Sequence, residues 1–193
     1  TIPGSEPAVD YVRAALLAGK SVVTSNKNVI AHQGPALLSL AERQGRQLRY
    51  EGAVGGAMPI VRVLGDGLTG DHVLRLDAIL NGTSNAVLSA MESSGCSLEE
   101  AIAEACAAGY AETDPSDDLE GVDAAAKLAI LCGLAFGARV LPSAIERRST
   151  SRVTETAIAA ARLRGGSVRQ VAHAQFDRTT RVLDAWVAPI FVP

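Results

Sequence analysis

The sequence comprises 193 residues, of which 48% are hydrophobic and 20% are charged, a composition that excludes intrinsic disorder. Its net charge of −3 gives no indication of a nucleic acid or an anionic membrane as a partner. No apolar run approaches the roughly 20 residues that a membrane span requires, and the first residues carry no secretion signal, so we expect a cytoplasmic protein.

The first quarter of the sequence alternates between helical and strand patterns. The elements predicted there are, in order, a helix between Pro7 and Gly19, a strand over residues 20–24, a helix over residues 28–44 and a strand over residues 47–51. This alternation is typical of α/β proteins, in which helices cover a parallel sheet. We therefore expect residues 1–50 to be the C-terminal part of a doubly wound, Rossmann-like nucleotide-binding domain.

A glycine-rich stretch, YEGAVGGAMPI, occupies residues 50–60 and can either turn tightly or point main-chain carbonyls at a ligand. An apolar stretch and a turn follow it, and the alternating residues 72–80 predict a strand. The polar turn NGTSN at residues 81–85 then precedes a helix, with Thr83 or Ser84 as its N-cap. Free amides at a helix start suit a carboxylate ligand, although simple capping explains the turn equally well.

The acidic segment, which we define as residues 109–131 (GYAETDPSDDLEGVDAAAKLAIL), combines many carboxylates with one cation, Lys127. The carboxylates belong to Glu112, Asp114, Asp117, Asp118, Glu120 and Asp123. Pro115 makes the first half a loop, and a helix is predicted over residues 118–136, on which Glu120, Asp123 and Lys127 share one face. An amine in such a place can polarise a carbonyl or relay a proton; the alternative is an ordinary surface ion pair.

The segments on either side of the acidic segment have simpler patterns. The predicted elements are a helix over residues 97–108 that ends at Gly109, a basic loop at 145–152, a helix over 153–164, and strands over 167–176 and 181–192. The basic loop is more typical of a solvated patch than of a phosphate site. The final strands leave an edge that pairs with the rest of the sheet or with a second subunit. The three cysteines have no metal-ligand spacing, so we expect them to be reduced.

Four stretches of the sequence, in their order and spacing, resemble the homoserine dehydrogenase family. They are VVTSNK at residues 22–27, YEGAVGGAMPI at 50–60, ILNGTSN at 79–85 and the acidic segment. The resemblance implies an oxidoreductase that interconverts L-homoserine and L-aspartate 4-semialdehyde with NAD or NADP, in the biosynthesis of threonine, methionine and isoleucine. It also implies that residues 51–193 form an α+β catalytic and dimerisation domain with a mixed sheet covered by helices.

The resemblance also implies roles for individual residues. Lys127 matches the residue usually assigned as the acid/base, and Lys27 matches a lysine near both nicotinamide and substrate. Asn26, Ser25 and Gly109 are the further cofactor-binding residues that it implies. The substrate-binding residues are Glu112, Asp118, Asp123, Tyr110, Gly82 and Thr83. In this set the three carboxylates can bind the substrate ammonium group, and Glu112 and Asp123 match the residues assigned to that contact in the family. Gly82 and Thr83 match the residues that contact the substrate carboxylate.

In the family, the loop that matches residues 50–60 holds a monovalent cation, usually sodium, largely through main-chain oxygens. The resemblance therefore implies a sodium site at Glu51, Val54, Gly56 and Met58. The alternative is a glycine-rich connection that binds no metal. Because main-chain oxygens would be the ligands, the identities of the Val54 and Met58 side chains test this expectation little.

No GxGxxG fingerprint follows a predicted strand in this sequence. In the family that fingerprint lies in an N-terminal segment that these residues do not include, so we expect this chain alone to bind NADP weakly or not at all. The partners implied are a small amino-acid substrate and a second copy of the chain, as a homodimer, with no nucleic acid and no membrane. Two alternatives remain open: a non-catalytic dimerisation or regulatory module derived from this enzyme, and a related amino-acid dehydrogenase.

Overall fold

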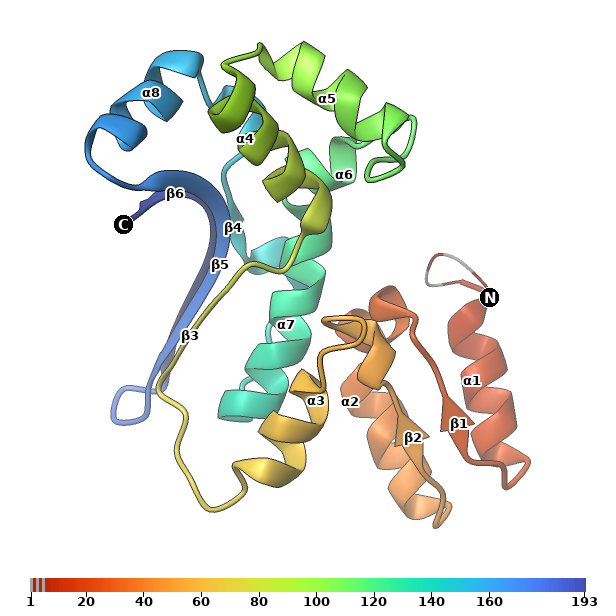
Figure 1. Ribbon diagram of the computed structural model, residues 1–193. Coiled ribbons are helices and arrows are strands. Elements are labelled where there is room, and N and C mark those ends of the chain that lie inside the picture. The colour runs from red at the N-terminus through yellow and green to blue at the C-terminus, as the bar shows by residue number, and fades with distance from the viewer. Residues whose placement is uncertain (1, 3, 5) are drawn as a thin grey trace. The chain divides into compact units, whose positions relative to one another are not determined.

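A computed structural model describes residues 2, 4 and 6–193 of the chain (Figure 1). The chain divides into two units. Unit 1 comprises Thr1–Leu74 and Ala126–Ala144, and unit 2 comprises Arg75–Ala125 and Ile145–Pro193. Helix α7, Val122–Phe136, contributes its first turn to unit 2 and its remaining residues to unit 1.

Unit 1 begins with the predicted alternation of helix and strand. Its elements are α1 (Ala8–Leu17), β1 (Val22–Val23), α2 (Lys27–Arg43), β2 (Leu48–Arg49), the 3-10 turn Glu51–Ala53, α3 (Ile60–Arg62), a π-helical turn (Val63–Gly67) and a 3-10 turn (Pro142–Ala144). The two strands pair in parallel, with Val22 beside Leu48, as expected when a helix connects them. Leu16 and Leu37 are fully buried, so α1 and α2 each turn an apolar face inward.

Unit 2 contains a mixed sheet whose strand order is β3-β5-β6-β4. Its elements are β3 (Arg75–Ala78), α4 (Gly82–Ser94), α5 (Leu98–Ala107), α6 (Ser116–Leu119), β4 (Glu146–Arg147), a 3-10 turn (Thr150–Arg152), α8 (Glu155–Leu163), β5 (Ser167–Asp177) and β6 (Val182–Val192). Strands β5 and β6 form a long curved hairpin, with β3 antiparallel to β5 and β4 parallel to β6 (Figure 1). This confirms the α/β class and the predicted mixed sheet covered by helices.

Helices α4, α5 and α8 form one hydrophobic core with the sheet of unit 2. Leu88 and Met91 of α4, Ile158 of α8 and Val168 of β5 are buried in it. Burial of each large apolar side chain of this kind contributes about 1.5–3 kcal/mol to stability. The core therefore holds α4 against the strands, and the site described below lies at the N-terminus of this helix.

The side chain of Asn85, on α4, pairs with the main chain of β5 beyond the point where β3 ends. Its Oδ1 accepts a hydrogen bond from Gln170 N at 3.0 Å, and its Nδ2 donates to Gln170 O at 3.2 Å. Asn85 thus makes the two hydrogen bonds that a neighbouring strand would make at this position. This contact joins α4 to β5 at a fixed register.

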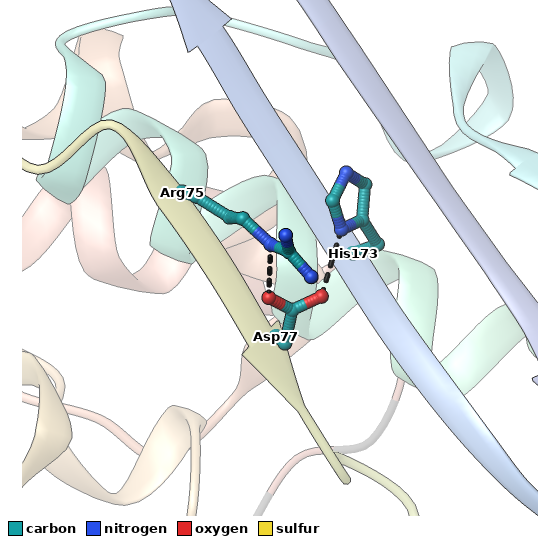
Figure 2. Close-up of polar contacts among 3 residues, drawn as sticks. All are labelled: Arg75, Asp77 and His173. Carbon is teal, nitrogen blue, oxygen red and sulfur yellow. Dashed lines mark hydrogen bonds and ion pairs between the residues drawn. The ribbon is translucent and has the colours of Figure 1, made fainter. Parts of the chain in front are cut away.

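A row of contacting side chains crosses the face of the sheet that points away from α4, α5 and α8. Asp77 of β3, His173 of β5 and Trp186 of β6 are neighbours in register, and side chains alternate between faces along a strand. His173 Nδ1 lies 2.8 Å from Asp77 Oδ1, and its ring stacks on Trp186 with centroids 4.7 Å apart. Arg75 also donates to Asp77, as Figure 2 shows, so this carboxylate lies between two partners.

The acidic segment differs from its predicted form in one respect. Residues 118–136 do not form one helix, because the chain breaks between α6 and α7 at Gly121, whose φ is +74°. Glu120 therefore lies outside α7, and its carboxylate accepts a hydrogen bond from Ser149 Oγ at 2.7 Å. The predicted shared face is reduced to Asp123 and Lys127.

Candidate active site

The carboxylates of Asp118 and Asp123 meet at the side chain of Asn81, within unit 2. Asn81 Nδ2 lies 2.6 Å from Asp118 Oδ1 and 2.9 Å from Asp123 Oδ2. Asn81 and Asp123 are 3% and 8% exposed, so the contact between them is shielded from water, whereas Asp118 is half-buried. Charge-assisted hydrogen bonds of this kind are shorter and stronger than those between neutral groups. Sequence reasoning did not select Asn81, although an asparagine directly before a helix is a strong capping signal.

Asn81 is also the N-cap of α4, in place of the predicted Thr83 or Ser84. Its Oδ1 accepts a hydrogen bond from Ser84 N at 2.8 Å, while Asn85 Nδ2 donates to its main-chain oxygen at 2.9 Å. Asparagine is among the best N-cap residues because its side-chain oxygen satisfies an amide that the helix leaves unpaired. The cap leaves the Asn81 amide nitrogen to serve the two carboxylates.

The main chain of Asp118 is held from two sides. Its carbonyl oxygen accepts from Ser84 Oγ at 2.7 Å and from Gln170 Nε2 at 3.0 Å. Gln170 is 1% exposed and also donates to Thr150 Oγ1 at 3.1 Å. Helix α6 is therefore tied to α4 and to β5. Sequence reasoning missed Gln170, since a glutamine in a strand gives no signal of a partner so far along the chain.

The predicted substrate-binding residues Thr83 and Tyr110 are neighbours. Thr83 Oγ1 donates to the carbonyl oxygen of Tyr110 at 3.0 Å. The chain reaches Tyr110 through Gly109, which ends α5 with a φ of +75°, as predicted. The Tyr110 side chain is 70% exposed, and Glu112 is exposed as well. The structure thus places Gly82, Thr83 and Tyr110 together at the start of α4.

The loop between Tyr110 and α6 ends near a carboxylate that bonds to the first amide of the helix. Asp114 Oδ1 accepts a hydrogen bond from Ser116 N at 3.1 Å, so Asp114 satisfies an amide at the start of α6. Hydrogen bonds from the Ser116 side chain and main chain lower the pKa of Asp114. Asp114 therefore has a local structural role that distinguishes it from Asp118 and Asp123.

In unit 1, Ser25, Asn26 and Lys27 form the turn from β1 into α2. Asn26 caps α2, with its Oδ1 accepting from Val29 N at 3.1 Å, and Lys27 is the first helical residue. Lys27 is half-buried. This turn lies at the carboxyl end of a parallel strand, where open α/β sheets bind ligands. Its position fits the predicted role of these residues in cofactor binding.

The glycine-rich loop approaches the same turn, because a Cβ placed on Gly52 would lie 3.2 Å from Ser25 Cβ. The carboxylate of Glu51 accepts from Val61 N at 3.0 Å and from Arg62 N at 3.0 Å, at the start of α3. The Glu51 side chain thus caps a helix, and only its main-chain oxygen would suit the predicted sodium site. Gly55 and Gly56 have φ values of +78° and +57°, so the main chain turns sharply between Val54 and Met58.

Lys127 is half-buried on α7, between the buried side chains of Ala126 and Leu128. Asp123 precedes it by one helical turn on the same helix. The predicted residues therefore fall into two groups. Unit 1 holds Lys27, Lys127 and the glycine-rich loop, and unit 2 holds the carboxylates with Gly82, Thr83 and Tyr110.

The group in unit 2 can bind a small amino acid. Asn81 is a neutral donor and adds no charge to the two carboxylates, and carboxylates are groups that bind an ammonium group. Within the described part of the chain, no group of three or more histidine, cysteine, aspartate or glutamate residues is arranged to hold a metal ion. The same residues include no helix that is long and apolar enough to cross a membrane.

Comparison with known proteins gives consistent results. The family model for homoserine dehydrogenase matches residues 59–193. The homoserine dehydrogenase of Mycobacterium tuberculosis strain H37Rv is 41% identical over 191 residues, which is 97% of this chain and 43% of that protein. That of Lactococcus lactis is 37% identical over 188 residues, covering 97% of this chain and 44% of that protein. The chain thus spans less than half the length of these relatives.

Solved structures of homoserine dehydrogenases have the same fold. The enzyme from Thiobacillus denitrificans matches with a TM-score of 0.94 and 35% identity, over 100% of this chain and 44% of that one. A hyperthermophilic archaeal homoserine dehydrogenase, solved in complex with NADPH, matches with a TM-score of 0.79 and 30% identity, over 99% of this chain and 54% of that one. Because the family model covers most of the chain and the solved structures share its fold, the chain belongs to the homoserine dehydrogenase family.

Proposed function

We propose that this chain carries the substrate-binding and acid/base residues of a homoserine dehydrogenase, which interconverts L-homoserine and L-aspartate 4-semialdehyde. The observation that carries the proposal is the family match over residues 59–193, which includes the turn at Gly82 and Thr83, the acidic segment and Lys127. We further propose that residues 1–50 are the last part of a nucleotide-binding domain, and that residues 51–193 form the catalytic and dimerisation domain of a cytoplasmic homodimer.

In this proposal Lys127 removes the proton from the substrate hydroxyl during oxidation and returns it during reduction. Lys27 is the second candidate for this role, or for polarising the same oxygen. A positioned general acid or base contributes about 10²- to 10⁴-fold to the rate. Glu112, Asp118 and Asp123 bind the substrate ammonium group, which fixes the orientation of the hydroxyl-bearing carbon.

The substrate carboxylate is assigned to Gly82 and Thr83, at the N-terminus of α4. The start of a helix presents main-chain amides and the positive end of the helix dipole, and both suit an anion. With the carboxylate held there and the ammonium held by the acidic segment, a homoserine molecule would be bound at both ends of its amino-acid backbone. Tyr110 lines the same site through its contact with Thr83.

The cofactor proposed is NADP or NAD, held by Ser25, Asn26, Lys27 and Gly109, and a related archaeal enzyme has been solved with NADPH. When bound, the nicotinamide accepts or donates the hydride. The turn from β1 into α2 fits such a group, because it lies at the carboxyl end of a parallel strand. A sodium ion is proposed at the main-chain oxygens of Glu51, Val54, Gly56 and Met58.

The test is homoserine-dependent reduction of NADP⁺ by the protein expressed from its complete gene. Lys127→Ala is expected to lose at least about 100-fold in kcat while still binding homoserine in a thermal-shift assay. Lys20→Ala is the matched control, because Lys20 is the one lysine of the sequence besides Lys27 and Lys127, is exposed and also belongs to unit 1. Full activity of Lys127→Ala would move the acid/base role to Lys27. An inactive wild type would overturn the proposed function in favour of a non-catalytic module.

A further inference from the structure

We propose that Asn81 is a positioning residue, which holds Asp118 and Asp123 together as a paired receptor for the substrate ammonium group. This inference rests on the proposed function and deepens it, because it explains how two carboxylates from different helices are kept at one place. Asn81 itself lies next to the assigned substrate residues Gly82 and Thr83 in the chain, but its own amide points at the two carboxylates.

The geometry of the Asn81 amide group allows it to hold both carboxylates at once. An asparagine Nδ2 has two hydrogens, which point in different directions within the plane of the amide. Each carboxylate therefore receives its own hydrogen, from Asn81 Nδ2 to Asp118 Oδ1 at 2.6 Å and to Asp123 Oδ2 at 2.9 Å. Both acceptor oxygens lie within 2.9 Å of a single atom, so their spacing is set by that atom.

Asn81 joins the two carboxylates as a neutral group. Two carboxylates held close together repel each other, and the amide that joins them adds no positive charge. Asn81 stabilises the pair through hydrogen bonds alone and adds no positive charge that would compete with a substrate cation for the carboxylates. A lysine or arginine at the same position would also hold the carboxylates, but it would neutralise part of the charge that binds the substrate.

Asn81 is itself held in place by further hydrogen bonds. Its Oδ1 is held by Ser84 N at 2.8 Å and its main-chain oxygen by Asn85 Nδ2 at 2.9 Å. Asn85 in turn pairs with the main chain of β5 at Gln170. Since the amide plane is fixed by these contacts, Asn81 is preorganised to hold the carboxylates before the substrate arrives.

Two variants separate this role from helix capping. Asn81→Asp has nearly the same shape and keeps a capping oxygen, but replaces the two N–H donors with a third carboxylate oxygen. Asn81→Ser also keeps a capping oxygen and is too short to donate to both carboxylates. Ser97→Ala is the control, because Ser97 caps α5 by accepting from Glu100 N and lies outside the site.

For Asn81→Asp we expect the KM for homoserine to rise about 10- to 100-fold, the range expected for lost hydrogen bonds to charged groups, because the third carboxylate repels Asp118 and Asp123 instead of holding them in place; the KM for NADP⁺ should be unchanged. The acid limb of the pH profile of kcat/KM for homoserine should also move to higher pH, because the carboxylates lose donors that favour their charged forms. Asn81→Ser should change both quantities in the same direction by less. Ser97→Ala should change neither, although it lowers the thermal unfolding temperature.

Homoserine binding can be measured by thermal shift, with 4-hydroxybutanoate as the analogue that lacks the ammonium group. This measurement distinguishes failure of the positioning role from failure of the proposed function. If the wild type turns over homoserine and either folded Asn81 variant has the same KM and the same acid limb as the wild type, the positioning role alone is overturned. If Asn81→Asp does not fold, Asn81→Ser carries the same test. A wild type that binds homoserine without turnover overturns the proposed function, and the loss of that binding in the variants would still support the role of Asn81. A wild type that neither binds nor turns over homoserine overturns both.

Discussion

Replacing Gly121 with alanine tests the break between α6 and α7. Gly121 has a φ of +74°, and a Cβ at this position would lie 3.1 Å from Cγ1 of Val187, a fully buried side chain of β6. The left-handed conformation costs an L-residue about 1–2 kcal/mol. Overpacking a well-packed core costs about 1–3 kcal/mol more. Alanine also restricts the unfolded chain, which reduces the net backbone term to about 1 kcal/mol, so we expect Gly121→Ala to lower the free energy of unfolding by about 2–4 kcal/mol.

Gly109→Ala supplies the matched control. Gly109 has a φ of +75°, and a Cβ there would meet no atom within 4 Å. Its substitution should cost only the backbone term, about 1 kcal/mol, because alanine also restricts the unfolded chain. The difference between the two variants isolates the contact with Val187. It can be measured by urea unfolding followed by circular dichroism.

A double-mutant cycle measures the contact between positions 121 and 187 directly. Val187→Ala removes Cγ1, so the double variant Gly121→Ala/Val187→Ala should be destabilised by about 1 kcal/mol less than the sum of the single variants. Equal losses for Gly121→Ala and Gly109→Ala, or strictly additive losses in the cycle, would show that β6 does not restrict the chain at Gly121.

Two further predictions concern ionisable groups in unit 2 and unit 1. The hydrogen bond from Arg75, followed by that from His173, lowers the pKa of Asp77 below its ordinary value of 3.8, so its stabilising effect is present above that value and is lost as the pH falls through the folded pKa. The stability difference between the wild type and Asp77→Asn, measured by urea unfolding, should therefore shrink below about pH 4, and a constant difference would contradict the contact. Burial raises the pKa of the Cys132 thiol to about 12, so in the native protein it should resist a thiol reagent at pH 8 while the half-buried Cys96 and Cys106 react. Rapid native modification of Cys132 in the Cys96→Ser/Cys106→Ser variant would show that this part of α7 opens readily, whereas all three thiols should react in urea.

The elements that local signals specify were predicted well from the sequence. The parallel pairing of residues 22 and 48, the end of α5 at Gly109 and the final hairpin all follow from periodicity and turn residues within a few positions. The break at Gly121 was missed because a glycine within a helical pattern is often tolerated, and its left-handed conformation depends on the packing of a distant strand.

The candidate site was predicted only in part, because some of its contacts also depend on tertiary packing. Thr83, Asp118 and Asp123 were selected, but the residue that joins the two carboxylates was not. Asn81 lies 37 and 42 residues before its two acidic partners, and Asn85 lies 85 residues before Gln170. Only tertiary packing brings such residues together, so no local pattern in the sequence reveals them. The capping rank of asparagine would have indicated the position of Asn81, though not its second role.

The pairing of Asn85 with β5 also affects how the protein behaves in a crowded solution. A strand with unpaired main-chain groups invites strands from other molecules, and this is a common route to aggregation. At Gln170 the donor and acceptor that would recruit another chain are already occupied by one side chain. Asn85 therefore protects this sheet edge from intermolecular pairing with no need for an additional strand, and the same contact that orders the substrate site also favours solubility.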